Sequence, residues 1–302
     1  MNPSAVLVGV TFMWGTTFLV TKDIVSESPP FTYIMLRFGL AALVLVPWCW
    51  SRIRRAGPGL WRDATLLAVL NTVGLSFQVL GQAYTSASKS SFVTSLNTPL
   101  TPLVGYLFYR TRPSLRQLGA LGLATFGVWL LTYPTDGAAF NRGDLLTLAC
   151  AGIYATVIVE LARRTPRHDA LALTAAQLVV TVVVCAAMLG LSRAAVAWVP
   201  AHQLPPALAL EGRPWIWSPR IVAELIYMAV VCTVLTFSVQ NWAMARMSAV
   251  AAAIIFSLEP VFATGMAALY DASEWPGLRG AVGAGLVIAG AIGSIAPRQE
   301  EA

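Results

Sequence analysis

The chain has 302 residues, of which 57% are hydrophobic and only 11% are charged. Soluble domains carry about 25% charged residues, so this composition argues against a soluble enzyme, a nucleic-acid-binding protein and a disordered chain. It predicts a protein that crosses a membrane many times. The net charge of +6 does not require an acidic partner, because membrane proteins concentrate Lys and Arg in their cytoplasmic loops.

Apolar stretches long enough to cross a bilayer, which takes roughly 20 residues, recur along the whole chain. We identify ten, at residues 4–21, 31–50, 64–83, 90–109, 115–133, 143–161, 170–191, 220–242, 248–270 and 277–296. Helices are predicted because a closed barrel would show alternating strands of about ten residues. The longest connection, 192–219, is rich in Pro and Trp and is expected to lie along the outer membrane interface.

The basic residues predict the orientation. With the N-terminus in the cytoplasm, 12 of the 20 Lys and Arg fall in cytoplasmic connections and 7 on the other side, while Arg37 lies inside a span. This excess indicates a protein of the cell inner membrane with both termini cytoplasmic. The first apolar stretch lacks a basic leader and a small-residue cleavage site, so we interpret it as a retained span rather than a signal peptide.

Neither a cofactor nor a metal site is expected. The four cysteines lie in apolar runs and form no CxxC or Cys/His cluster, and the two histidines, His168 and His202, lie far apart in the chain. The HExxH, GxSxG and P-loop patterns are absent, so we expect no catalytic residues and no direct use of ATP.

The chain resembles itself at a constant offset of 161 residues. The matched positions are Pro99 and Pro260, Tyr109 and Tyr270, and the GALG at 119–122 and the GAVG at 280–283. Each unit contains five spans, and because five is odd the second unit enters the membrane from the opposite side. We therefore predict an all-α protein of two inverted five-helix repeats, residues 1–133 and 143–296, which is an architecture of many secondary transporters.

Several motifs resemble those of the EamA-type drug/metabolite transporters. The WGTTF at 14–18 is similar to that family's WG-x-x-F signature in span 1, and the SLEPVFA at 257–263 resembles its span 9. Glu274 resembles a Glu common before span 10, whereas the matching site near Pro113 has no acid. Within the family the chain looks most like the YddG-type exporters of aromatic amino acids. The resemblance implies alternating-access transport of small organic molecules.

Two ionisable residues lie well inside predicted spans, where burial of a charge costs at least about 2.5–3.5 kcal/mol. Glu259 stands 11 residues from either end of span 9. It is a candidate to take a proton or to bind a cationic substrate group, or it is a structural carboxyl hydrogen-bonded to its neighbours. Arg37 is six residues inside span 2, where a structural or gating ion pair is favoured over a substrate carboxylate.

Prolines and polar residues in mid-span mark a candidate path. Pro99 and Pro260 each remove a helix hydrogen bond, so we expect matching kinks in spans 4 and 9. Asn97 lies beside the first kink, and Gln78 is polar in mid-span. Both are candidate substrate contacts, although polar residues in spans commonly join helices. The same two interpretations apply to Gln177.

Two aromatic residues lie deep in the membrane rather than at its interfaces. Trp14 and Tyr154 stand at positions 11 and 12 of the first span of each repeat. A pair of inward rings near the repeat axis would stack on a planar substrate or hold a cation over a ring face, and core packing is the alternative.

The sequence thus predicts an exporter of small organic molecules, preferably aromatic amino acids, that is not an enzyme. The alternatives are an exporter of cationic drugs or other metabolites and an intramembrane lipid-modifying enzyme. Its partners would be the substrate and the bilayer, with no nucleic acid. A ridge of small residues at Ala281, Gly285, Ala289 and Gly293 favours close helix packing within a monomer or across a homodimer.

Overall fold

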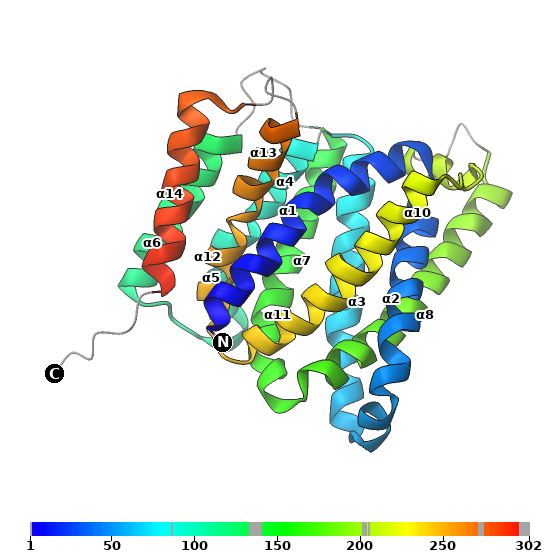
Figure 1. The fold of residues 1–302 in the computed structure, drawn as a ribbon, viewed down its shortest axis with the longest axis horizontal. Coiled ribbons are helices and arrows are strands. Elements are labelled where there is room, and N and C mark those ends of the chain that lie inside the picture. Colours follow the sequence, from blue (N-terminus) through cyan, green and yellow to red (C-terminus); the bar gives the residue numbers. More distant parts are fainter. Residues whose placement is uncertain are drawn as a thin grey trace.

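The computed structural model describes residues 2–85, 87–132, 141–200, 204, 206–270 and 275–295. All regular structure in these ranges is helical, and the helices run side by side through the molecule in alternating directions (Figure 1). The predicted all-α fold is confirmed. We call the end of the bundle at which the first helix begins the N-face, and the other end the opposite face.

The first half contains α1 (Pro3–Glu27), α2 (Pro30–Arg55), α3 (Pro58–Gln82), α4 (Ala87–Ser95), α5 (Asn97–Tyr109) and α6 (Leu115–Thr132). The second half contains α7 (Arg142–Arg164), α8 (Ala170–Trp198), α10 (Pro219–Ile226), η4 (Tyr227–Leu235), α11 (Thr236–Met244), α12 (Ala249–Phe256), α13 (Glu259–Tyr270) and α14 (Gly277–Ile295). Short turns occupy η1 (Thr165–Arg167), α9 (Pro206–Ala209) and η3 (Leu210–Gly212).

Nine of the predicted spans correspond to helices that, within the described residues, are long and apolar enough to cross a membrane. The tenth, 90–109, is divided between α4 and α5. The division of the chain at 133–143 stays a prediction, because most of that segment lies outside the described residues.

Two spans are interrupted at matching positions of the repeat. One helix ends before Leu96 and the next begins at Asn97, two residues ahead of Pro99. The other interruption ends α12 at Phe256, four residues ahead of Pro260. Each proline lacks the N–H that would bond to the carbonyl four residues earlier, so the helical ladder fails at that point.

A third span departs from regular helix in a way that its sequence did not predict. Residues Tyr227–Leu235 form a π-helix, in which the hydroxyl of Thr233 donates to the carbonyl of Met228 at 2.8 Å. A π-helix forms backbone hydrogen bonds between residues i and i+5, and such segments are frequent at functional sites.

The first helix of each repeat packs against the other repeat. α1 contacts α11, α12 and α13, and α7 contacts α3, α4 and α5, so the two halves are interlocked. Glycine permits the close approach: a Cβ on Gly15 would lie 2.8 Å from Cβ of Phe262, and one on Gly81 would lie 2.6 Å from the hydroxyl of Thr147. The glycine of the WGTTF motif is thus required by packing.

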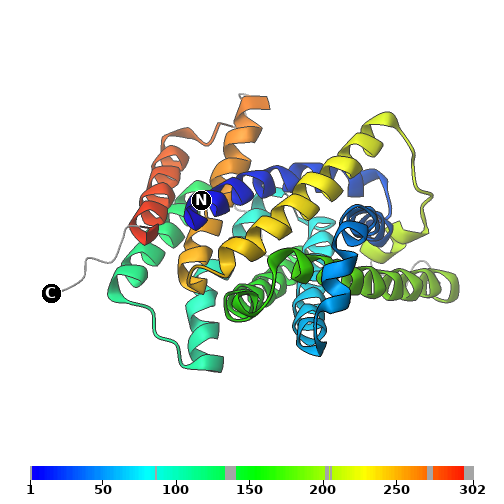
Figure 2. The same ribbon diagram turned by 60° about the horizontal axis from the view of Figure 1, so that its bottom comes forward.

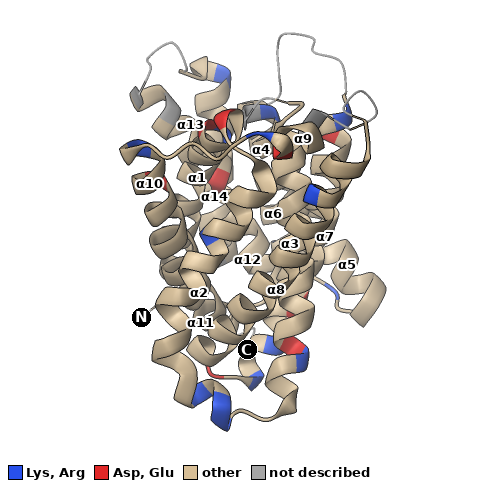
Figure 3. Ribbon diagram, turned by 90° about the vertical axis from the view of Figure 1, so that its right-hand side faces the viewer, with Lys and Arg blue, Asp and Glu red and all other residues tan. Residues whose placement is uncertain are grey.

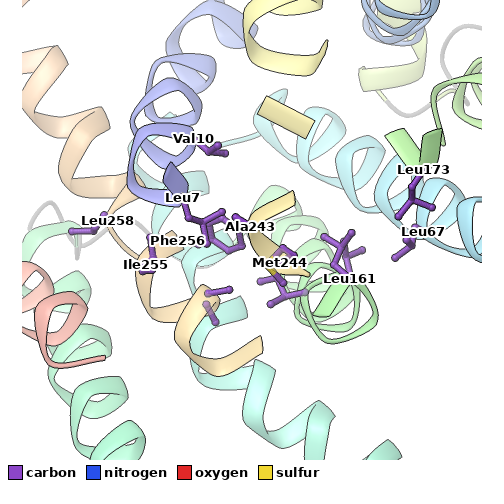
Figure 4. Packing of buried hydrophobic residues seen from close by; sticks show 14 of the residues in the cluster. Leu7, Val10, Leu67, Leu161, Leu173, Ala243, Met244, Ile255, Phe256 and Leu258 are labelled. Carbon is purple, nitrogen blue, oxygen red and sulfur yellow. The ribbon is translucent and has the colours of Figure 1, made fainter. Parts of the chain in front are cut away.

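The N-face end is closed by apolar side chains. Leu7, Leu161, Met244 and Phe256 belong to one buried cluster that joins α1, α7, α11 and α12 (Figure 4). These residues lie near the N-face ends of their helices or at the N-face side of the helix break. Figure 3 shows the charged residues mostly at the two ends of the bundle, and its middle nearly free of charge, as a membrane interior requires.

Helices α6 and α14 form a pair at the edge of the bundle (Figure 2). Their contact runs through Gly127 and Gly283, where an added Cβ would come within 2.7 Å of the facing carbonyl. Of the predicted ridge of small residues, a Cβ on Gly293 would lie 3.9 Å from Cβ of Ala120 on α6, whereas Gly285 has no atom within 4 Å of its Cβ position. The ridge thus contacts the chain at one end, and its use in a dimer stays a prediction.

Candidate functional site

A cavity of about 100 Å³ lies between the two repeats near the middle of the bundle. Its lining consists of Trp14, Thr17, Arg37, Phe38, Asn71, Leu75, Gln78, Thr94, Asn97, Tyr154, Val157, Ile158, Phe237, Gln240, Phe256 and Glu259. All six residues predicted as substrate contacts are in this set. They come from α1, α2, α3, α5, α7 and α13, so the fold brings together positions that lie up to 245 residues apart.

Aromatic rings form one wall of the cavity. The ring of Trp14 lies 5.4 Å from that of Phe256 and 6.3 Å from that of Phe237, and its indole N–H donates to Thr236 at 3.1 Å. The Tyr154 ring packs on Gly74, where a Cβ would lie 2.8 Å from Cε1. The Tyr154 hydroxyl has no hydrogen bond to a described residue, so it is free to contact a ligand.

Arg37 is buried, with 5% of its surface exposed, and neutral groups hold it. Its Nε donates to the Thr233 hydroxyl at 2.9 Å and its Nη2 to the Cys232 carbonyl at 3.2 Å, both in the π-helix. A longer contact of 3.5 Å reaches Tyr33. No described carboxylate pairs with this guanidinium, so its charge faces the cavity without the expected ion-pair partner.

Glu259 places a carboxyl group in the same cavity. It is the first residue of α13, directly after the interruption in span 9, and its carboxyl group makes no hydrogen bond or ion pair with any described residue. The backbone of this residue also lies against α1, because its carbonyl would be 3.2 Å from a Cβ on Gly15. The cavity therefore presents a carboxyl group and a guanidinium group that have no ionic partner among the described residues.

The predicted amides differ in their surroundings. Gln78 donates to Thr94 at 3.3 Å, and both line the cavity. Asn97 accepts from Thr98, whose hydroxyl also contacts the Ala253 carbonyl and so joins the two interrupted spans. Gln177, by contrast, accepts from Asn241 at 2.7 Å and joins α8 to α11 outside the cavity lining.

Sequence reasoning missed several lining residues. Phe256 falls in a continuous apolar run and Phe237 lies between two hydroxyl residues, and neither pattern distinguishes a cavity-facing ring from a lipid-facing one. Gln240 had a usable signal, because a mid-span amide among apolar neighbours needs a partner or a polar cavity. Glu274 and His202 lie outside the described residues.

A buried ionic network, the N-face network, closes the N-face beside the apolar cluster. Asp63 of α3 contacts Arg164 of α7, and its other carboxyl oxygen lies 2.9 Å from Nε2 of His168. Arg164 also bonds to Glu160 at 2.5 Å, and Glu160 accepts from Tyr109. The Asp63 side chain is only 4% exposed, so this network is shielded from solvent.

A related but exposed group, the opposite-face cluster, lies at the other end of the bundle. Arg220 contacts Asp23 of α1 and bonds to Glu224 at 2.9 Å, with its side chain 57% exposed. Glu224 lies 161 residues after Asp63, the offset of the internal repeat. The two repeats thus place an ionic contact at equivalent sites, one buried at the N-face and one exposed at the opposite face.

Polar residues continue from the cavity toward the opposite face. Ser91, Ser90 and Gln82 lie beyond Thr94 on α4 and α3, and each has a buried polar atom without a hydrogen-bond partner. Buried polar atoms of this kind are commonly hydrated. The side of the cavity toward the N-face is apolar, so the two routes out of the cavity differ in polarity.

The sequence matches the EamA-like transporter family over residues 3–133 and 141–296. Two proteins of Archaeoglobus fulgidus, each named an uncharacterized transporter, are 25% identical to it; one match covers 84% of this chain and 73% of the relative, the other 92% of both. The uncharacterized transporter YcxC of Bacillus subtilis is 22% identical over 94% of this chain and 89% of its own length.

A solved structure, described only as the crystal structure of a protein, has a similar fold. It superposes with a TM-score of 0.73 at 16% identity and covers 96% of this chain and 95% of its own. The family match falls in two segments, one in each half of the chain, and the helical fold agrees with it. The chain is a multi-span membrane protein that belongs to the EamA-like transporter family.

Proposed function

We propose that this transporter exports amino acids, with a preference for aromatic side chains, by alternating access. One observation carries the proposal: Arg37 and Glu259, each without an ionic partner among the described residues, line one cavity whose wall is aromatic. An α-amino acid is a zwitterion, so its carboxylate would pair with Arg37 and its ammonium with Glu259. Each charge in the site would then be neutralised by the substrate rather than by the protein.

The depths of the two charged residues suit such a ligand. The first residue of α2 and the last residue of α13 both lie at the opposite face. At a rise of 1.5 Å per residue, Arg37 lies about 10 Å along α2 from that end and Glu259 about 16 Å along α13. The backbones therefore differ in depth by about 6 Å. Two long side chains and an amino-acid head group can bridge that difference.

The aromatic wall supplies the preference among amino acids. Trp14, Phe237 and Phe256 offer ring edges and faces to an aromatic side chain, and such pairs contribute about 0.5–1.5 kcal/mol beyond area burial. The free hydroxyl of Tyr154 adds a hydrogen-bond partner. A charged side chain would face aromatic rings rather than polar groups on this side of the cavity.

The repeat supplies a mechanism for moving the substrate. Inverted repeats have two related conformations, in which the halves exchange roles and the cavity opens to one face and then the other. In this structure the apolar cluster and the N-face network close one end. The polar residues beyond Thr94 support an exit toward the opposite face.

A counterflow assay in liposomes tests the proposal. Liposomes that contain the purified protein are loaded with one unlabelled amino acid or organic cation. Entry of labelled phenylalanine or tryptophan into these liposomes is followed at two pH gradients. We expect aromatic amino acids to accelerate exchange most, and a response to the pH gradient would show proton coupling. Stimulation by organic cations alone would contradict the amino-acid proposal, and turnover of a lipid without solute movement would favour the enzyme alternative.

A further inference from the structure

A second cavity, separate from the transport cavity, lies at the N-face. Its volume is about 540 Å³, and it is lined by the end of α2, the start of α3, η1 and the start of α8. The lining residues are Arg52, Arg55, Ala56, Gly57, Gly59, Leu60, Arg167, His168, Asp169 and Ala172. We call it the arginine pocket.

The arginine pocket carries more positive charge than its own residues neutralise. Arg52 pairs with Asp169 at 3.2 Å, and that aspartate also caps α8 through the amide of Ala172. Arg55 and Arg167 make no ion pair or side-chain hydrogen bond with a described residue. Three guanidinium groups therefore face one carboxylate, and two of them are available to a ligand.

The backbone at the pocket adds to this preference for an anion. The N-cap of α3 is Gly57, so the helix begins without a side-chain cap. Neither Gly57 nor Gly59 has an atom within 4 Å of its Cβ position, so the first turn is open to a ligand. The positive end of a helix dipole favours negative charge, although the arginines carry most of the argument.

The position of the pocket indicates which anion it meets. Trp48 and Trp50 precede Arg52 on α2 and are 88% and 52% exposed, as expected of indoles at a membrane interface. Leu43 and Val44, one turn further into the membrane, are also exposed and offer an apolar surface. The pocket thus opens at the depth of lipid headgroups, directly beside a path for acyl chains.

We propose that the arginine pocket binds the phosphate headgroup of an anionic phospholipid, with Arg55 and Arg167 as its principal contacts. Basic pockets between membrane helices are known sites for anionic headgroups. His168 belongs both to this pocket and to the N-face network through Asp63. A bound headgroup would therefore lie next to the contacts that close the N-face.

Native mass spectrometry of the purified full chain in detergent tests this proposal. Phosphatidylglycerol is titrated against phosphatidylcholine with the unaltered protein and with the double variant Arg55→Gln/Arg167→Gln. The control is Arg54→Gln/Arg112→Gln, which removes two exposed N-face charges outside the pocket. We expect the pocket variant to bind phosphatidylglycerol on the order of tenfold more weakly and the control to bind as the unaltered protein does.

Two further measurements make the result decisive. The variant Arg55→Lys/Arg167→Lys keeps both charges and should keep most of the lipid binding, which shows that charge rather than packing is responsible. Inorganic phosphate at the same concentration should not displace the lipid. Equal weakening in the pocket and control variants would overturn the proposal, and displacement by inorganic phosphate would assign the pocket to a soluble phosphate compound instead.

Discussion

Arg37 and Glu259 are the two ionisable residues of the cavity, and their surroundings differ. Arg37 offsets its burial with three hydrogen bonds to neutral groups, two of which exist because the π-helix presents the Cys232 carbonyl and the Thr233 hydroxyl toward α2. Glu259 has no such partners within the described part of the chain. An unpaired carboxyl in a cavity requires a ligand, water or a proton to be stable. At the residue scale, Glu259 is thus the group most dependent on what enters the cavity.

Substitutions of Arg37 and Glu259 should weaken the binding of different groups of the substrate, the carboxylate and the ammonium group. We expect Glu259→Gln and Arg37→Gln each to weaken exchange of phenylalanine roughly ten- to hundredfold, the range for losing one charge-assisted hydrogen bond. Phenylalaninamide, which lacks the carboxylate, should be insensitive to Arg37→Gln, and 3-phenylpropionate, which lacks the ammonium, should be insensitive to Glu259→Gln. Counterflow with the three compounds measures this, and equal losses for all of them would refute the assignment.

At the scale of elements, close helix contacts and helix interruptions shape the cavity. Gly15 lets α1 reach α13 beside Glu259, and the prolines of spans 4 and 9 end one helix and start another at the cavity wall. Asn97 and Glu259 therefore stand at helix beginnings, where the carbonyl groups freed by proline must face protein or water. The motif glycine and the two prolines shape the site although they are not among the residues that line the cavity.

Gly15→Ala should destabilise the protein because the added methyl group would lie 2.8 Å from Cβ of Phe262. Overpacking of this kind costs typically about 1–3 kcal/mol. The control is Gly9→Ala on the same helix, where no atom lies within 4 Å. Thermal unfolding in detergent should show a lower midpoint for the first variant alone, and indistinguishable midpoints would show that α1 and α13 separate at little cost.

The two related ionic contacts predict unequal effects of equivalent substitutions. Asp63→Asn breaks a buried network and leaves Arg164 without one partner, which costs about 3–5 kcal/mol for buried pairs. Glu224→Gln, 161 residues later, alters a pair whose arginine side chain is 57% exposed and should cost at most about 1 kcal/mol. Thermal unfolding compares them directly. A larger loss for Glu224→Gln would mean that the opposite face, rather than the N-face, carries the stronger closure.

The whole molecule consists of two interlocked repeats that are closed unequally. The first helix of each repeat packs against the other repeat, so a movement of one half also involves a helix that packs in the other half. The N-face combines apolar packing with a buried ionic network, whereas the opposite face combines polar residues with a buried pair of Lys89 and Asp144 and the exposed opposite-face cluster. The two ends thus differ in their apolar packing, and a difference between the ends is expected of a single state of an alternating-access cycle.

The orientation of the whole molecule in the membrane is open to a direct test. All four native cysteines are buried, so they should give little background in thiol labelling. In intact cells, Arg213→Cys on the opposite face should react with a membrane-impermeant maleimide, whereas Arg112→Cys on the N-face should react only after lysis. The reverse pattern would place the termini outside and contradict the prediction from basic residues.

Much of the fold followed from the sequence alone. The number of spans follows from the length of apolar runs, because the bilayer sets a fixed thickness. The inverted repeat follows from the offset of 161 and an odd number of spans per unit. The prolines indicated where spans 4 and 9 are interrupted, and low charge content made Arg37 and Glu259 conspicuous, since buried charges are rare in hydrocarbon.

Only the tertiary structure decided which of these residues meet. In apolar spans, hydrophobicity does not vary between the lipid-facing and the protein-facing side, so the rings of Phe237 and Phe256 carried no signal. The same ambiguity left open whether the small-residue ridge of α14 packs within the chain or in a dimer. The π-helix around Cys232 and the exchange of first helices depend on contacts between distant segments. Sequence thus determined the spans, the repeat and the rare charges, and long-range packing decided that Arg37 and Glu259 share one cavity.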